Sequence, residues 1–152
     1  MKKILLAMVF GAAALHANAQ NCEEREQALL TAFGGLSASY LYNTYGVIGS
    51  IGDGFGCDTY DVNMVDDLLS AQKRVLDNMI TTIDNLILKK HLTDTSDISF
   101  SKSFIDLMKG LRQQADLLID YSKTKAKKKL TEYEAQRNKN WKDLAKLMGI
   151  EG

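Results

Sequence analysis

Apolar side chains between residues 62 and 86 recur in alternating steps of three and four, which is the spacing of a heptad seam on an α-helix. Seven of the eight seam positions are apolar. They are Val62, Val65, Leu69, Gln72, Leu76, Met79, Ile83 and Leu86. Further apolar residues flank the seam at Leu68, Val75, Ile80 and Ile87. A stripe this wide predicts a helix that packs against more than one neighbour, as in a helical bundle.

Polar residues mark both ends of this helix. Asp58, with Asp61 three residues later, is typical of a capping arrangement that places negative charge at the positive end of the helix dipole. The basic run Lys89-Lys90-His91 suits the opposite end. Residues 93–99 then form a polar connector whose side chains compete for backbone hydrogen bonds. We therefore expect the chain to turn back over 93–99.

Two more apolar stripes follow the connector. The first comprises Phe104, Ile105, Met108, Leu111, Ala115, Leu118 and Ile119. The second comprises Leu130, Tyr133, Trp141, Leu144 and Met148. We expect Ser101 or Ser103 to cap the first stripe and Gly149 to end the second, with Trp141 as a core anchor of the last helix.

No glycine or proline separates these two stripes. A single helix over residues 101–149 would be about 70 Å long. Because a domain of this size offers little to support such a rod, we expect a kink or short break within the lysine run 123–129.

Residues 27–52 form a stretch of 26 residues without a formal charge. One interpretation is a segment that inserts into a membrane. The other, which we favour, is the central helix of the bundle, covered by its neighbours on all sides, because Asn43, Thr44 and several small residues interrupt the apolarity. Five glycines between Gly46 and Gly56 then predict a glycine-rich loop over about 49–57.

The first 19 residues have the pattern of a secretory signal peptide. Two lysines follow Met1, an apolar run covers residues 4–15, and Ala17-Asn18-Ala19 matches an A-x-A cleavage site. We therefore expect residues 20–152 to be a soluble protein in the periplasm or outside the cell. The predicted fold class is all-α: one small antiparallel bundle of three to four helices, with the glycine-rich loop after the first helical segment and a basic C-terminal segment over 123–149.

Two cysteines, Cys22 and Cys57, are candidates for a disulfide in an oxidising compartment. A straight helix over residues 23–48 would span about 38 Å, and the nine residues up to Cys57 reach back at most about 30 Å. We expect a fold-back at Gly34-Gly35 to resolve this conflict. The alternatives are unpaired thiols or a pair between molecules.

The charges of the chain are unevenly spread. Without the predicted signal peptide, 17 basic side chains stand against 19 acidic ones, so net charge gives no reason to expect a nucleic-acid partner. Residues 123–146, however, hold nine Lys or Arg against three acids. This segment predicts a basic end of the molecule, with the remainder acidic.

The basic segment supplies the candidate partner-binding residues: Lys123, Lys125, Lys127, Lys128, Lys129, Arg137, Lys139 and Lys142. Such a surface could bind anionic lipid head groups at a membrane surface, an acidic partner helix or nucleic acid. Nucleic acid is the least expected of these for an exported protein. The simpler interpretation is a solvated helix face.

No set of residues meets the needs of a known chemistry. His91 is the one histidine after the predicted cleavage site, and its place at a helix end suits the helix dipole better than catalysis. The acidic residues between Asp53 and Asp61 do not follow the ligand order of an EF-hand. We therefore expect no enzyme activity, no catalytic residues, no metal site and no cofactor.

These observations favour a non-enzymatic exported protein that works by helix-mediated association with a protein partner or with itself. It would be a subunit, adaptor or holdase-like component of a cell-envelope assembly. One alternative is a carrier that binds a small apolar ligand between the helices, in a cleft lined by Phe33, Tyr40 and Tyr45. The other is a membrane-active protein that inserts residues 27–52.

Overall fold

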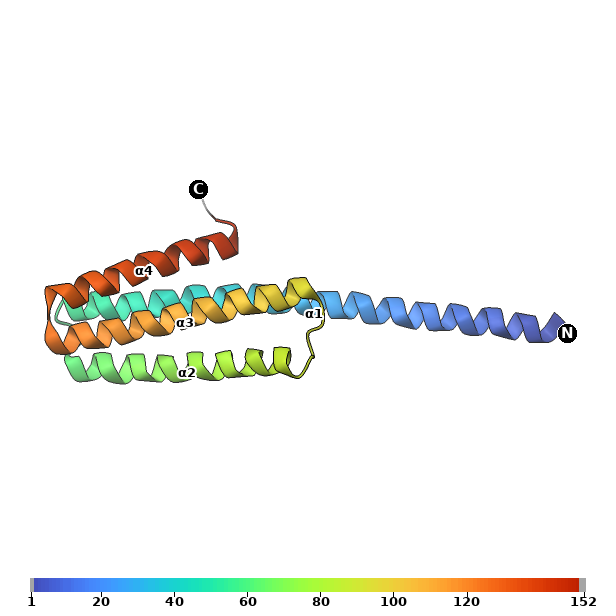
Figure 1. Cartoon of the computed structure of the whole chain (residues 1–152), viewed down its shortest axis with the longest axis horizontal. Helices are drawn as coiled ribbons and strands as arrows, with labels where there is room; N and C mark the ends of the chain where they lie inside the picture. The colour runs from blue at the N-terminus through green and yellow to red at the C-terminus, as the bar shows by residue number, and fades with distance from the viewer. Residues whose placement is uncertain (1, 151–152) are drawn as a thin grey trace. The chain divides into compact units, whose positions relative to one another are not determined.

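The computed structural model is built from four α-helices, and it describes the backbone of residues 2–150 and the side chains of residues 24–150. The helices are α1 (Lys2–Gly56), α2 (Val62–Leu88), α3 (Thr95–Thr124) and α4 (Lys127–Met148) (Figure 1). The predicted all-α class is confirmed. The chain divides into two compact units, Met1–Ser37 and Ala38–Gly152, and the second unit contains the bundle described below.

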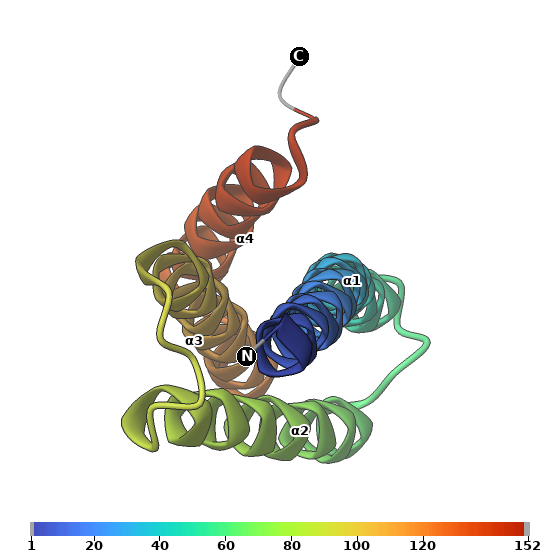
Figure 2. The ribbon, with the colours of Figure 1, turned by 90° about the vertical axis from the view of Figure 1, so that its right-hand side faces the viewer.

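Within the second unit, α3 packs against both α2 and α4, which lie on either side of it in the end-on view (Figure 2). The last part of α1, residues 38–56, contacts all three of the other helices. The Gln72 amide of α2 donates to the Thr44 hydroxyl at 3.2 Å. Phe55 meets the Tyr121 ring of α3 edge-on at 5.8 Å, and Asp53 pairs with Arg137 of α4 at 3.3 Å.

The heptad seam of α2 faces the core as predicted. Four of its positions are buried, Val65, Leu69, Leu76 and Ile83. The other four are half-buried. The flanking apolar residues differ in exposure. Leu68 and Val75 remain more than 40% exposed, whereas Ile80 and Ile87 are half-buried. Leu68 and Val75 therefore extend the apolar stripe onto the surface of the bundle.

All seven residues of the first stripe after the connector are buried on α3, which confirms it as a core face. In the second stripe, Tyr133 and Leu144 are buried, but the expectation for Trp141 was wrong. Trp141 is 39% exposed and lies against Tyr45, with ring centroids 5.5 Å apart. Its neighbour Asn140 takes the buried position, because α4 faces a polar side chain of α3 there.

Two of the predicted helix starts were misplaced. Asp61 is the N-cap of α2, with its carboxylate accepting from the Met64 amide, and Asp58 lies before it in the loop with a positive φ of 55°. Asp94 caps α3 and accepts from the Ser96 amide, so neither Ser101 nor Ser103 does so. The connector accordingly covers residues 89–94 in place of the expected 93–99. A side chain caps a helix where it reaches a free amide of the first turn. Asp94 does so, whereas Ser101 and Ser103 lie one to two turns inside α3.

The break within the lysine run is confirmed. Helix α3 ends at Thr124, and Lys125 adopts the left-handed conformation with φ 51° before α4 begins at Lys127. The Lys125 amide donates to the Tyr121 carbonyl at 2.7 Å, which closes the last turn of α3. Gly149 ends α4 in the left-handed conformation, also as predicted.

Three expectations for α1 were wrong. The helix continues through Gly34 and Gly35 without the predicted fold-back, and it also continues to Gly56, so the predicted glycine-rich loop is helical and the true loop covers residues 57–61. The third expectation was a helix covered on all sides, but Val47 is 45% exposed. A glycine inside a helix costs only about 1 kcal/mol of stability relative to alanine, and packing contacts outweigh this cost.

Two glycines of α1 face side chains of α4 that approach the backbone closely. A Cβ at Gly52 would lie 2.7 Å from the Tyr133 hydroxyl, and one at Gly49 would lie 3.1 Å from the Arg137 guanidinium. The absence of a Cβ at these two glycines therefore lets side chains of α4 pack directly against the backbone of α1. They serve as packing positions within a helix and not as loop residues.

The predicted disulfide remains a prediction. Cys57 is exposed, and its thiol is free among the residues that the structure describes. The side chain of Cys22 lies outside the described residues.

Candidate functional site

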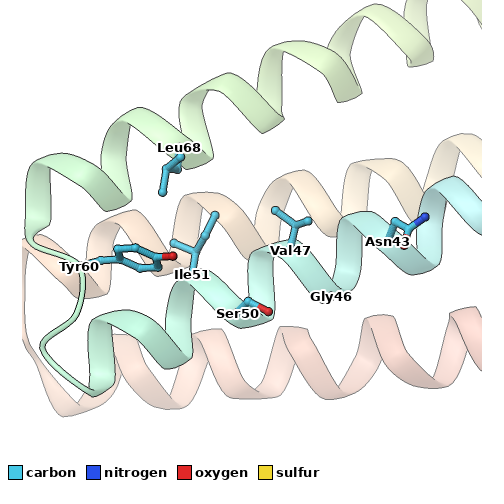
Figure 3. A pocket seen from close by; sticks show the side chains of 7 residues that line it. All are labelled: Asn43, Gly46, Val47, Ser50, Ile51, Tyr60 and Leu68. Atoms are coloured by element: carbon cyan, nitrogen blue, oxygen red, sulfur yellow. The ribbon is translucent and has the colours of Figure 1, made fainter.

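An open cleft of about 430 Å³ lies between α1 and α2. It is lined by Asn43, Gly46, Val47, Ser50, Ile51, Tyr60 and Leu68. Figure 3 shows Val47 and Ile51 of α1 and Leu68 of α2 directed toward one another, with Tyr60 of the connecting loop at one end. None of the seven lining residues carries a formal charge at neutral pH, so the cleft is suited to an uncharged and largely apolar surface.

The sequence positions these side chains through two helical periodicities. Thr44, Ile48 and Phe55 of α1 point into the core, so Val47, one residue before Ile48, lies about 100° around the helix and faces the cleft. On α2, Leu69 is fully buried, and Leu68 lies on the adjacent side, 43% exposed. The apolar stripes of α1 and α2 are thus wider than the core can cover.

The three predicted ligand-cleft residues do not line this cleft. Phe33 is half-buried and belongs to the first unit. Tyr45 stacks on Trp141 of α4, whereas Tyr40, five residues earlier, points about 140° away from it around the helix. Burial raises the pKa of the Tyr40 hydroxyl. The structure therefore does not bring Tyr40 and Tyr45 into one cleft. The sequence signal for the cleft is the set of apolar residues that lie beside the buried positions, such as Val47 on α1 and Leu68 on α2.

Much of the predicted basic surface is neutralised within the bundle. Lys123 pairs with Asp66 of α2 at 2.7 Å, and this hydrogen bond lowers the pKa of the Asp66 carboxyl. Lys129 pairs with Asp120 and Glu132, both at 3.2 Å, which raises the pKa of its ammonium group, mainly through Asp120.

The remaining candidate basic residues have weaker or no partners. Arg137 pairs with Asp53 at 3.3 Å, Lys139 with Asp143 at 2.9 Å, and Lys128 with Glu132 at 3.9 Å. The Lys125 ammonium lies 5.6 Å from the centroid of the Phe55 ring. Lys127 and Lys142 have no ion-pair partner among the described residues. Acidic residues distant in sequence thus fold against part of the basic segment, and its role in partner binding stays a prediction.

A polar ladder joins α3 to α4. The Asn140 amide donates to the Gly110 carbonyl and to the Gln114 side-chain oxygen, both at 2.9 Å. The Gln136 amide donates to the Asn140 side-chain oxygen at 2.8 Å. A Cβ at Gly110 would lie 2.5 Å from that oxygen, so only glycine admits Asn140 here. These bonds set the register of α4 on α3.

A second open cleft, of about 470 Å³, lies between α3 and α4 and is lined mainly by charged residues. Lys139 and Asp143, which form an ion pair, both line it. Exposed ion pairs of this kind contribute little binding energy, so this cleft is less suited to a stable partner than the one between α1 and α2.

The chemistry-bearing side chains are not grouped into a site. His91 is exposed just beyond α2, as its position in the sequence predicts. Among the described residues, no three His, Cys, Asp or Glu side chains are placed to hold a metal ion. Over the same residues, no helix has a stretch long and apolar enough to span a membrane.

Comparisons with protein-family models, curated proteins and solved structures found no match for this chain.

Proposed function

We propose that this chain is an exported, non-enzymatic helical-bundle protein that works by helix-mediated protein association, as a subunit, adaptor or holdase-like component of a cell-envelope assembly. The observation that carries the proposal is the uncharged cleft between α1 and α2. Its walls are apolar, and Val47 and Leu68 are each more than 40% exposed there. Contiguous exposed apolar surface of this kind marks interaction sites on small proteins.

The shape of the cleft supports a helical partner. Antiparallel helices α1 and α2 form its two walls, and a third helix laid between them would contact both, as helices do when an amphipathic helix binds in a groove. Gly46 leaves open space at its Cβ position, with nothing within 4 Å. A partner backbone can therefore come close to α1 at this point.

The cleft is a better candidate for the binding surface than the basic segment. Six of the eight basic candidates already contact a partner within the bundle, and a binding partner would have to compete with those contacts. Lys127 and Lys142 are the two that do not. Two exposed lysines on one helix supply little of the desolvated contact area that stable interfaces need.

Site-specific photo-crosslinking in cells tests the proposal. A photoreactive residue replaces Leu68 in the cleft, the exposed Lys102 on α3 as a control, or Lys128 in the basic segment, in otherwise identical chains. We expect an adduct of one defined mass from position 68 and none from position 102. The additional change Val47→Lys places a charge at the edge of the cleft and should abolish that adduct, while the helical circular dichroism spectrum stays unchanged.

Two outcomes contradict the proposal. Equal labelling from positions 68 and 102 indicates random collision, and an adduct from position 128 alone places the binding surface on the basic segment. The mass of the purified protein tests export in the same preparation. A chain that begins near Gln20 agrees with removal of the first 19 residues, and an intact Met1 in exported material does not.

One observation favours a second candidate function, which is carriage of a small apolar ligand. The cleft volume of about 430 Å³ lies within the range of small-molecule sites. Native mass spectrometry of the purified chain tests this candidate. A retained molecule that Val47→Lys displaces supports it, and a bare protein mass under gentle ionisation contradicts it.

A further inference from the structure

We propose that α2 carries a twofold self-association surface, through which a second copy of this chain lies antiparallel along the cleft between α1 and α2. This inference rests on the proposed function and names the partner of the same cleft. It is carried by the arrangement of apolar and charged residues on the outer side of α2.

The outer side of α2 has an apolar seam of its own. Its members, Met64, Leu68, Ala71 and Val75, are separated by steps of four, three and four residues, which is again heptad spacing. Each member comes one residue before a position of the buried seam, so at 100° per residue this seam lies about 100° around the helix from the buried one. The three large members are 43–46% exposed, and Ala71 is exposed as well. No described helix covers them.

This seam is short and symmetric. Beyond Val75, the same spacing leads to Asn78, which is polar, so the apolar part covers only about three turns. Its centre lies between Leu69 and Ser70. An antiparallel copy that shares this centre places Met64 opposite Val75 and Leu68 opposite Ala71, and then repeats both contacts by symmetry. The apolar seam of each copy is then buried completely by the other.

The charges beside the seam select the antiparallel direction. Asp67 and Arg74 both flank the seam on its outer side, seven residues apart, and neither forms an ion pair within the described chain. In the antiparallel arrangement, Asp67 of each copy faces Arg74 of the other, which gives two ion pairs. In a parallel arrangement, these flanks of the two helices lie on opposite edges of the interface, so Asp67 and Arg74 would not meet. The surface is thus complementary in charge to itself, which is the reason for assigning a second copy as its partner.

Helix α1 leaves room for this arrangement. Along the cleft it presents Val47 as an apolar contact, and the uncharged Asn43, Gly46 and Ser50 are its other lining residues apart from Ile51. A helix of the second copy in the cleft would therefore contact α1 as well as α2, with no charge to desolvate on the α1 side. Two α1–α2 pairs would together form a four-helix interface.

Analytical ultracentrifugation of the full chain tests the proposal. We expect a reversible monomer–dimer equilibrium for the unmodified protein. Each of the changes Asp67→Lys and Arg74→Glu removes two attractive ion pairs and creates two repulsive ones. Either change should raise the dimer Kd by about 10- to 100-fold, with the far-ultraviolet dichroism unchanged. Lys102→Glu, a reversal of an exposed charge on α3 that has no ion-pair partner among the described residues, is the matched control and should leave the Kd within about twofold.

Mixing the two single variants is the decisive measurement. In a heterodimer of Asp67→Lys with Arg74→Glu, both charge pairs are again between opposite charges, because the reversed position of one copy faces the reversed position of the other. We expect the mixture to associate about as well as the unmodified protein, at concentrations where each variant alone is monomeric. Only a twofold antiparallel interface makes this prediction.

Several results would overturn the inference. A chain that stays monomeric at a concentration of several hundred micromolar has no such dimer, and reversals without effect on the Kd, or a mixture that does not recover, exclude this interface. These failures are distinguishable from failure of the proposed function. If position 68 crosslinks to a different protein, association through the cleft stands and self-association falls. If position 68 gives no adduct, both fall.

Discussion

Replacing Gly110 by alanine should destabilise the bundle, although the same change normally stabilises a helix. Alanine is better than glycine in a helix interior by about 1 kcal/mol. At Gly110, however, the new Cβ would lie 2.5 Å from the Asn140 side-chain oxygen, a separation that forces Asn140 to move. The outcome depends on which of these two effects is larger.

The polar ladder gives the magnitude of the opposing effect. Asn140 is 1% exposed and donates to the Gly110 carbonyl and to Gln114, each at 2.9 Å. Displacing it leaves the buried Gln114 oxygen without its donor, at about 1–3 kcal/mol, and removes the part-buried bond to the Gly110 carbonyl, at about 0.5–1.5 kcal/mol. Against the gain of about 1 kcal/mol, we expect Gly110→Ala to lower the free energy of unfolding by about 0.5–3.5 kcal/mol.

Urea unfolding followed by circular dichroism at 222 nm measures this difference, at a protein concentration where the chain is monomeric. Gly46→Ala is the matched control, because the new Cβ meets nothing within 4 Å. That change should raise the free energy of unfolding by about 0.5–1 kcal/mol. The two substitutions are chemically identical, so an opposite sign isolates the contact with α4.

A double-mutant cycle sharpens the test. Asn140→Ala removes the side chain that the new methyl group would meet, so the combination with Gly110→Ala should cost at least about 1 kcal/mol less than the sum of the two single changes. If Gly110→Ala proves as stable as the unmodified chain, or if the two changes are additive, the packing of α4 described above is incorrect.

Three further predictions concern other parts of the bundle. Lys125 has a φ of 51°, so Lys125→Gly should stabilise the chain by about 1 kcal/mol, measured as a higher urea midpoint; a lower midpoint would contradict the left-handed turn. Ile48 is fully buried and Val47 is 45% exposed, so Ile48→Ala should cost about 2–5 kcal/mol and Val47→Ala less than about 1 kcal/mol in the monomer; equal costs would refute the one-sided burial of α1. Lys123 lowers the pKa of the Asp66 carboxyl, and a lowered folded-state pKa gives stability that is present above about pH 4 and lost as the pH falls further. The stability difference between the unmodified chain and Lys123→Met should therefore shrink on acidification, and a difference that does not change with pH would rule out the Lys123–Asp66 pair as its source.

The candidate site was only partly accessible from the sequence. The flanking residues Leu68 and Val75 are visible as a widened stripe, but a stripe of this kind is equally consistent with burial by a further neighbour. The cleft exists because α1 covers only one side of the α2 seam and leaves Leu68 43% exposed. In the same way, no local pattern relates Lys123 to Asp66 or Arg137 to Asp53, so the neutralisation of the basic segment could not be predicted.

The sequence by itself determined the helical class, the three core seams that follow Asp61 and the break within the lysine run, because periodicity and the absence of proline act over short distances. The tertiary structure decided the outcome wherever a local preference was weak. Gly49 and Gly52 are helical because α4 packs onto them, and Asn140 is buried in place of Trp141 because Gly110 and Gln114 of α3 bind its amide. For each of the two glycines, a local preference of about 1 kcal/mol was outweighed by contacts between residues distant in the chain.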